Sequence, residues 1–193
     1  MMKKIGFFGG TFDPIHIGHL FLALQLAEAH LLDEVWVCPA FCSPFKTSSP
    51  PEVNAERRLR MVQLAIEPIP NFKVLSIEVE KKKKSYTVDT LKELPPAEYH
   101  LLLSEESAAG FLQWKEAELL ATLAPPLIGC RQGNASFQSW KEHPLLKRGL
   151  TPTHTIEISS TEIRRRLKNK LYCGHLVPAK ALDYILEHQL YFC

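Results

Sequence analysis

The stretch KKIGFFGGTFDPIHIGHLFLALQLAEA, residues 3–29, contains the clearest indication of the fold class. It begins with a short apolar run, Lys3 to Phe8, which predicts a buried strand that ends at the tight turn Gly9-Gly10. It ends with Gly18 to Ala29, which is apolar nearly all round, as expected of a helix that packs deep against a sheet. A strand, a glycine turn and a helix in this order predict the beginning of an α/β fold.

The rest of the chain continues the alternation of strands and helices. This order predicts a Rossmann-like, doubly wound, mainly parallel sheet with helices on both faces. Further strands are expected over Glu34 to Cys38, Phe72 to Ile77, Tyr99 to Leu103, Pro126 to Cys130 and Thr155 to Ile158, and helices over Asn54 to Ile66, Thr87 to Leu94, Lys115 to Leu123, Ser160 to Lys168 and Pro178 to His188.

The helix expected over residues 54–66 is amphipathic. Leu59, Val62 and Ile66 recur at helical spacing and predict its apolar face. Its charged residues are expected on a solvent-exposed face, and they are Glu56, Arg57, Arg58 and Arg60.

Length and composition predict an ordinary globular protein. A chain of 193 residues with 46% hydrophobic and 23% charged residues is expected to form one domain over residues 1–193. A formal net charge of +2 argues against a dedicated duplex-DNA binder, so no nucleic-acid partner is expected. No segment has about 18 uninterrupted apolar residues, and the apolar run after Lys4 is too short for a signal peptide, so no membrane association is expected.

The five cysteines are an odd number and form no repeated pairs, which favours reduced thiols in a cytoplasmic protein. Cys38 and Cys42 resemble half of a zinc site, but the sequence offers no second Cys or His pair for it. The four consecutive lysines at residues 81–84 predict a solvated loop that raises the local concentration of anionic substrates.

The loop at residues 9–19 suits a polyphosphate ligand. Its double glycine lets the backbone approach a ligand closely, and the helix that begins near Gly18 offers unpaired amides. His16 and His19 are three residues apart, so both can face one side of the first helical turn. The loop lacks the Lys-Ser/Thr of a Walker A motif. It resembles the T/H-x-G-H signature of the nucleotidyltransferase superfamily, which class I aminoacyl-tRNA synthetases share in a related form.

The stretch ISSTEIR, residues 158–164, is a second candidate anion site. A serine followed three residues later by a glutamate fits a capping box, so a helix is expected to begin here. Its first amides and hydroxyls can meet a phosphate, and Arg164 lies one turn from Ser160 and can reach the same anion. Arg165 and Arg166 point elsewhere around the helix and are expected in solvent.

Both motifs resemble those of bacterial nicotinate-nucleotide adenylyltransferases, and the similarity covers nearly the whole chain. SYTVDTL at residues 85–91 matches the family's S-Y-T-x-D-T-L segment, and Trp114 matches its binding-site tryptophan. These two matches favour nicotinate mononucleotide as the acceptor. Further matches are Pro44-Phe45-Lys46 with the family's Pro-His-Lys loop, Arg131 and Gly133 with its R-x-G turn, and Leu176 to Pro178 with the helix around Tyr184 at its C-terminal end.

The resemblance implies adenylyl transfer from ATP to nicotinate mononucleotide, with Mg²⁺ held mainly by the ATP phosphates and no dedicated metal ligand. The implied catalytic residues are His16, His19, Lys46 and Arg164. The implied ATP contacts are Gly9, Gly10, Thr11, Phe12, Gly18, Ser104, Glu106, Ile158, Ser160 and Thr161. The implied nicotinate-mononucleotide contacts are Asp13, Lys46, Ser85, Tyr86, Thr87, Trp114 and Arg131. Asp13 also fits two other roles, an indirect partner of the metal and a turn residue before Pro14.

The sequence departs from the family pattern at two places. Ser104 and Glu106 stand where the family has glycine and aspartate, which is expected to alter how the sugar or adenine of ATP is held. Phe45 replaces a histidine, so Lys46 is expected to take more of the phosphate contact.

The sequence leaves other functions open. The same chemistry on nicotinamide mononucleotide or phosphopantetheine is the nearest alternative, and a nucleotide-binding regulatory module without turnover belongs to another class. A tRNA synthetase fragment would need a K-M-S-K-S-type loop, which this chain lacks. Association of identical chains into an oligomer also stays open.

Overall fold

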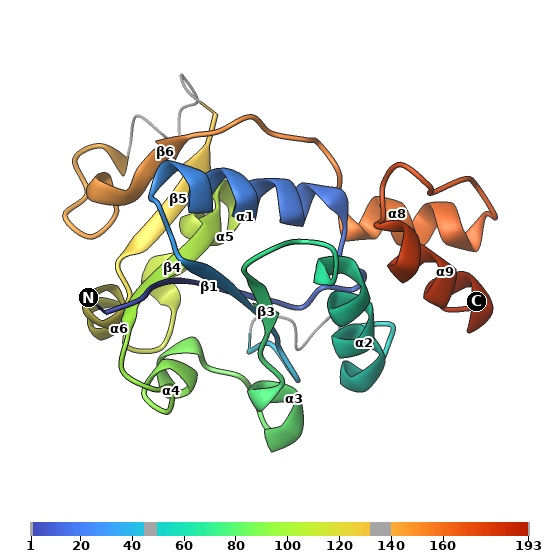
Figure 1. Ribbon diagram of the computed structural model, residues 1–193, viewed down its shortest axis with the longest axis horizontal. Helices are drawn as coiled ribbons and strands as arrows, with labels where there is room; N and C mark the ends of the chain where they lie inside the picture. Colours follow the sequence, from blue (N-terminus) through green and yellow to red (C-terminus); the bar gives the residue numbers. More distant parts are fainter. Residues whose placement is uncertain (1, 45–49, 132–139, 193) are drawn as a thin grey trace. The chain divides into compact units, whose positions relative to one another are not determined.

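The computed structural model describes residues 2–44, 50–131 and 140–192 (Figure 1). Its strands are β1 (Lys4–Gly10), β2 (Glu34–Pro39), β3 (Phe72–Val74), β4 (Glu98–Ser104), β5 (Pro126–Cys130) and β6 (Leu150–Pro152). In this part of the chain they form one sheet of order β3-β2-β1-β4-β5-β6. β1 pairs with β4, β4 with β5 and β5 with β6, all in parallel. The predicted α/β class and mainly parallel sheet are therefore confirmed.

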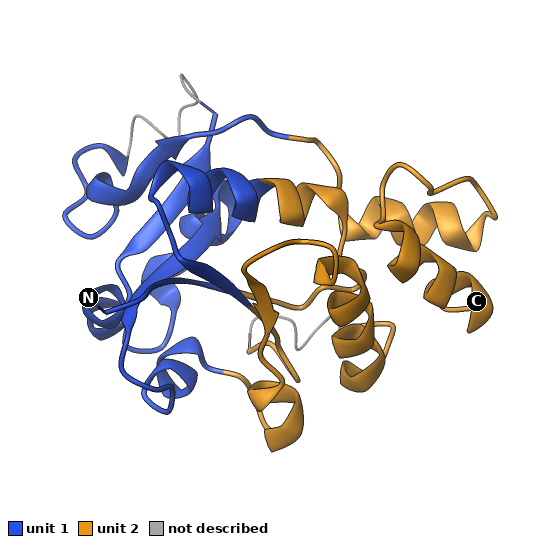
Figure 2. Cartoon of the chain, in the orientation of Figure 1, with its two compact units in different colours: residues 1–8, 22–36, 86–155 blue, residues 9–21, 37–85, 156–193 orange. Residues whose placement is uncertain are grey.

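The chain folds into two compact units, each assembled from several segments (Figure 2). Unit 1 holds residues 1–8, 22–36 and 86–155, and unit 2 holds residues 9–21, 37–85 and 156–193. The helix α1 (Ile17–Ala29) begins in unit 2 and continues in unit 1. The single domain expected over residues 1–193 stays a prediction beside this division.

The core of unit 1 lies along β4 and β5. Leu101 to Leu103 and Ile128 are almost completely buried, as expected of strands in a parallel sheet that helices cover. The register pairs Leu102 with Leu127. The helices of this unit are α4 (Thr87–Leu91), α5 (Glu105–Ala109) and α6 (Ala117–Leu123), with the short 3-10 helices η1 (Phe111–Gln113) and η2 (Lys147–Gly149).

Unit 2 contains α2 (Ala55–Ile66), α3 (Ile77–Lys81), α8 (Ser160–Lys168) and α9 (Ala179–Glu187) (Figure 1). Asn54 caps α2 because its side chain accepts a hydrogen bond from the backbone N–H of Arg57 at 2.9 Å. α2 packs on α9, and each helix has buried apolar residues. None of the helices in the described part of either unit is long and apolar enough to cross a membrane.

The last strand lies elsewhere than the sequence predicts. Thr155 to Ile158 is mostly exposed and forms no strand, whereas β6 comes five residues earlier and pairs Thr151 with Gly129. Gly149 permits this pairing, because a Cβ there would lie 1.7 Å from the carbonyl oxygen of Pro126. The predicted strand at 72–77 is also shorter than expected, since α3 begins at Ile77.

The prediction of a wholly exposed charged face on α2 is wrong for one residue. Arg57 and Arg60 are exposed, but Arg58 is only 1% exposed. Its position, four residues before Val62, places it beside the apolar stripe of the helix.

Candidate active site

The two histidines of the first loop lie together at the start of α1. Their rings stack with centroids 3.6 Å apart and planes inclined by 25°. The Nδ1 atom of His19 accepts a hydrogen bond from the backbone N–H of His16, and the Nδ1 atom of His16 accepts one from the backbone N–H of His19. In the neutral form each ring therefore carries its proton on Nε2. The two Nε2–H groups are therefore hydrogen-bond donors that lie side by side.

His16 is buried, with 5% of its surface exposed. Burial lowers the pKa of His16 to about 4, because the charged imidazolium loses its hydration. The ring is therefore neutral at neutral pH. It can donate a hydrogen bond from Nε2 to an anion without bringing a formal charge.

Acid should destabilise the protein through His16. The pKa is lower in the folded chain than in the unfolded chain, so the unfolded chain takes up the proton first as the pH falls. The free energy of unfolding should fall by roughly 3 kcal/mol as the pH passes from about 6.5 to about 4. Urea unfolding between pH 7 and pH 4 measures this loss.

A His16→Asn variant isolates that contribution. Asparagine keeps an acceptor near the position of Nδ1 but does not titrate, so the loss between pH 6.5 and 4 should shrink by the same amount. The exposed His154 supplies the control, and His154→Asn should follow the pH profile of the unmodified protein. Parallel profiles for His16→Asn and the unmodified protein would contradict the assignment.

The N-terminus of α8 is attached to the first loop by side chains. The Ser160 hydroxyl donates to the carbonyl of Pro14 at 2.9 Å. The Nη1 atom of Arg164 donates to the carbonyl of Asp13 at 2.8 Å, and its Nη2 atom lies 3.4 Å from the Thr161 hydroxyl. The residues of the two predicted anion motifs therefore do meet, and both motifs belong to unit 2.

Arg164 also forms an ion pair that the sequence did not predict. Its Nε atom lies 2.8 Å from Oε1 of Glu52, whose side chain is 51% exposed. An ion pair this exposed contributes little to stability. An anion with more charge than one carboxylate can therefore compete with Glu52 for the guanidinium of Arg164.

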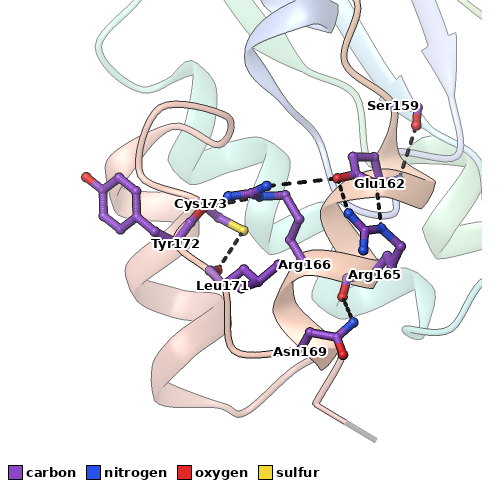
Figure 3. A network of polar contacts seen from close by, with 8 residues as sticks. All are labelled: Ser159, Glu162, Arg165, Arg166, Asn169, Leu171, Tyr172 and Cys173. Atoms are coloured by element: carbon purple, nitrogen blue, oxygen red, sulfur yellow. Dashed lines mark hydrogen bonds and ion pairs between the residues drawn. The ribbon is translucent and has the colours of Figure 1, made fainter.

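The neighbouring Arg165 and Arg166 of α8 make a different set of contacts (Figure 3). Arg165 makes two hydrogen bonds of 2.7 Å to Glu162, and Arg166 donates to the carbonyl of Tyr172. The helix start predicted at Ser159 is confirmed, because its hydroxyl accepts from the backbone N–H of Glu162 at 3.1 Å (Figure 3). The carboxylate of Glu162 accepts from Arg165, so the structure gives one of the two bonds of a capping box. Arg165 is exposed as predicted, while Arg166 is half-buried.

Asp13 is buried within the first loop. Its Oδ1 atom accepts a hydrogen bond from the hydroxyl of Tyr191 at 2.7 Å, and its Oδ2 atom accepts one from the backbone N–H of Glu52 at 2.8 Å. Both oxygens therefore have protein partners, which fits the role of a loop-bracing residue. The predicted contact of Asp13 with the mononucleotide stays a prediction.

Two glycines of the loop lie close to its aromatic side chains. A Cβ on Gly18 would lie 3.1 Å from Nδ1 of His16, and a Cβ on Gly10 would lie 2.8 Å from the ring of Phe12. Either addition would push a ring of the loop out of place. The absence of a side chain at these positions therefore helps to set the histidine geometry.

The predicted nicotinate residues divide between the units. Ser85 belongs to unit 2, where its hydroxyl accepts from the backbone N–H of Phe41 at 3.1 Å. Tyr86 and Trp114 belong to unit 1. Lys115, which the sequence did not single out, connects their two segments, because its Nζ atom lies 4.9 Å above the ring of Tyr86 and 2.8 Å from Asp89 of α4.

The remaining predicted residues lie at strand and helix ends. Ser104 ends β4 and caps α5, accepting from the backbone N–H of Ser107 at 3.2 Å, while Glu106 is exposed in the first turn of α5. Arg131 follows β5 and donates to the hydroxyl of Thr155 at 2.8 Å. Thr87 begins α4, Ile158 precedes the cap of α8, and Gly9 lies within β1. Phe45, Lys46 and Gly133 lie outside the described residues.

A protein-bound metal cluster is not formed by the described residues. In residues 2–44, 50–131 and 140–192, no three or more His, Cys, Asp and Glu side chains lie together as metal ligands. The cysteines at 38, 42, 130 and 173 are all free, and the first of them has its pKa raised by burial. Nucleotidyltransferases of this kind generally use a divalent metal.

A sheet of this strand order binds ligands at the loop that follows β1, where the order of the strands reverses. In this chain that loop carries paired imidazole donors and contacts an arginine-bearing helix start. The family model described as cytidylyltransferase-like matches residues 7–166. The chain therefore belongs to the cytidylyltransferase-like family of nucleotidyltransferases.

Two relatives of similar length show to which group within this family the chain belongs. A protein of Oceanobacillus iheyensis, named probable nicotinate-nucleotide adenylyltransferase, is 34% identical over 98% of this chain and 97% of its own. A Thermus thermophilus protein of the same name is 39% identical over 97% of this chain and 99% of its own. Within the larger family, the chain is a member of the nicotinate-nucleotide adenylyltransferases.

Solved structures agree with the fold. The nicotinic acid mononucleotide adenylyltransferase of Plasmodium falciparum, solved in complex with NaAD, superposes with a TM-score of 0.77. It is 22% identical and covers 98% of this chain and 97% of its own. At that identity the likeness supports the nucleotidyltransferase fold of this chain.

Proposed function

We propose that this protein transfers the adenylyl group of ATP to nicotinate mononucleotide, forming nicotinate adenine dinucleotide and pyrophosphate. The observation that carries the proposal is the pair of stacked imidazoles of His16 and His19, with both Nδ1 atoms engaged by backbone N–H groups. Paired Nε2–H donors suit the non-bridging oxygens of a phosphate that gains charge during the reaction. The relatives of this chain carry the corresponding name.

For this reaction the protein has to align the phosphates of the two substrates and neutralise their negative charge. A phosphate oxygen of the mononucleotide attacks the α-phosphorus of ATP, a new P–O bond forms, and the bond to the bridging oxygen breaks as pyrophosphate leaves. The nucleophile is already an anion, so no general base has to remove a proton. We assign His16, His19 and Arg164 to the phosphates that react, and the hydroxyls of Ser160 and Thr161 to the same anions.

We propose Mg²⁺ as the metal, bound through ATP phosphate oxygens and water. A small, hard cation prefers oxygen ligands and often keeps several waters, so it does not require a cage of protein side chains. When bound, it neutralises phosphate charge and so complements the donors of the first loop. Asp13, whose carboxylate oxygens both accept protein hydrogen bonds, is available to it at most through water.

The nicotinate end of the acceptor needs a flat apolar wall and donors for a carboxylate. We assign the wall to Trp114, whose ring centroid lies 5.6 Å from the ring centroid of Phe111. Backbone amides near Tyr86 and Thr87, at the start of α4, are assigned to the carboxylate. Lys46 and Arg131 remain proposed contacts of the mononucleotide. Ser104 and Glu106 remain proposed contacts of ATP, together with Gly9, Gly10, Thr11, Phe12, Gly18 and Ile158.

Trp114→Ala should raise the KM for nicotinate mononucleotide about 5-fold, since an aromatic stack contributes on the order of 1 kcal/mol. The kcat value and the KM for ATP should change by less than about twofold, because Trp114 is assigned to binding of the acceptor alone. Steady-state kinetics with each substrate varied in turn measure these constants. Trp114→Phe keeps a stacking ring and serves as the control, and an unchanged KM in Trp114→Ala would remove this residue from the acceptor site.

The direct test is pyrophosphate release from ATP and Mg²⁺ with three acceptors in parallel, namely nicotinate mononucleotide, nicotinamide mononucleotide and phosphopantetheine. Strong preference for nicotinate mononucleotide is expected. Release with another acceptor would keep the phosphate chemistry and overturn the acceptor. ATP binding without release for any acceptor would instead favour a regulatory module. The cytoplasmic location expected from the cysteines is retained as part of the proposal.

A further inference from the structure

A buried guanidinium holds three backbone segments of unit 2 together. Arg58 of α2 is 1% exposed, and its Nε atom donates to the carbonyl of Val53 at 3.1 Å. Its Nη2 atom donates to the carbonyl of Phe41 at 3.0 Å, and its Nη1 atom donates to the carbonyl of Thr11 in the first loop. Burying a cation is costly, so an arginine in this position has to be well satisfied by its partners. Here those partners are carbonyls that the folded chain has to bring together.

A second buried contact lies two residues further along the first loop. The Tyr191 hydroxyl donates to Asp13 Oδ1 across a sequence separation of 178 residues, and Tyr191 is 6% exposed. Burial and the adjacent Asp13 carboxylate raise the pKa of Tyr191, so its hydroxyl keeps the proton that it donates. The backbone N–H of Glu52 completes the contacts of Asp13.

Phe12 lies between these two contacts in a conformation that phenylalanine rarely adopts. Its φ of 50° is in the left-handed region, which costs energy for a bulky side chain and persists only where the surroundings enforce it. Arg58 holds the carbonyl before Phe12, and Tyr191 holds the side chain after it. The Phe12 ring meets the His19 ring edge to face, with centroids 5.1 Å apart.

We propose that Arg58 and Tyr191 are positioning residues for adenylyl transfer. Through Thr11 and Asp13 they keep Phe12 in its left-handed conformation, and the ring of Phe12 in turn fixes the ring of His19. This inference rests on the proposed function, because His19 is a catalytic residue only if the transfer occurs. Neither residue has to contact substrate, so the loss of either should act on turnover more than on substrate binding.

Tyr191→Phe removes one oxygen atom and keeps the ring in place. Amide hydrogen exchange of the segment at residues 9–21, measured on the substrate-free protein, should become about 10-fold faster. The kcat value should fall about 10-fold with both KM values within about twofold, because a displaced reacting group slows chemistry more than it weakens binding. Tyr172→Phe is the matched control, since Tyr172 is 69% exposed, and it should leave exchange and kcat unchanged.

Arg58→Lys tests the other contact. Lysine keeps the charge but cannot reach three carbonyls with the planar guanidinium geometry, so faster exchange at residues 9–21 and a kcat lowered at least 10-fold are expected. Arg57→Lys changes the exposed neighbour on the same helix and should leave both measurements unchanged. If Arg58→Lys does not fold, Tyr191→Phe decides the proposal by itself.

Unchanged exchange at residues 9–21 in the variants would overturn the proposal, and so would faster exchange with an unchanged kcat. A fall in kcat that matches a general loss of folded protein, seen as faster exchange throughout unit 2, would also overturn it. The unmodified protein is assayed first. If it releases no pyrophosphate with any acceptor, the proposed function fails, and the exchange data still show whether the two residues hold the loop.

Discussion

Replacing His19 by alanine should lower kcat for adenylyl transfer by about 10²–10³-fold while the KM for ATP changes only a few-fold. The Nδ1 atom of His19 accepts from the backbone N–H of His16, so Nε2–H is the group that we assign to a phosphate oxygen. A hydrogen bond that strengthens as the α-phosphate gains charge contributes to the transition state more than to substrate binding. Steady-state pyrophosphate release gives both constants.

Two further substitutions separate catalysis by His19 from its structural role. His19→Asn keeps an acceptor near Nδ1 for the backbone but has no donor at the position of Nε2, so its kcat should fall as far as that of His19→Ala. The exposed His175 supplies a control, and His175→Ala should retain full activity. Recovery of activity in His19→Asn would mean that the residue serves only to brace the turn.

The parts of the site that sequence reasoning predicted are those determined by local chemistry. The N-cap bond from Glu162 to Ser159 needs only residues three apart, and the strand, loop and helix around the two histidines are consecutive in the chain. The mainly parallel sheet followed from the alternation of strands and helices. In each case the deciding residues are neighbours in sequence, so the pattern carries the structural information.

The contacts that brace the loop depend on distant segments, and sequence reasoning missed them. Arg58 is buried because carbonyls of residues 11, 41 and 53 converge on it, and charged residues are expected on the surface when no such partner is known. One signal was present, since Arg58 precedes Val62 by four residues and so lies along the apolar stripe of α2. The contact between Asp13 and Tyr191 joins residues 178 positions apart and left no local pattern.

The last strand was missed for a related reason. A three-residue segment that ends in Pro152 has few of the residues that favour strands, whereas Thr155 to Ile158 is rich in them. Pairing decided the outcome, because Thr151 lies opposite Gly129 of β5 and the backbone N–H of Thr153 donates to the carbonyl of Cys130. Intrinsic preference is a weak guide for a short edge strand whose neighbour is far away in sequence.

The second large effect is expected at Arg164, the residue by which α8 reaches the first loop. Arg164→Ala should lower kcat/KM by on the order of 10²–10³-fold, because it removes the cation proposed to neutralise the reacting phosphates. Its guanidinium already contacts the carbonyl of Asp13 and the exposed carboxylate of Glu52. Since an exposed ion pair of this kind is weak, a multiply charged phosphate should displace Glu52 from Nε at little cost.

The neighbouring Arg165 provides a matched control for this prediction. It carries the same charge on the same helix, but it pairs with Glu162 and its side chain is 58% exposed. Arg165→Ala removes the same charge from the helix but leaves the contacts of Arg164 in place, so it should change kcat/KM by less than about twofold. Arg164→Lys should recover part of the lost activity, because lysine restores the charge without the planar geometry of the guanidinium. Equal losses in Arg164→Ala and Arg165→Ala would mean that α8 acts through its overall positive charge, and the specific contact of Arg164 with the first loop would then have no catalytic role.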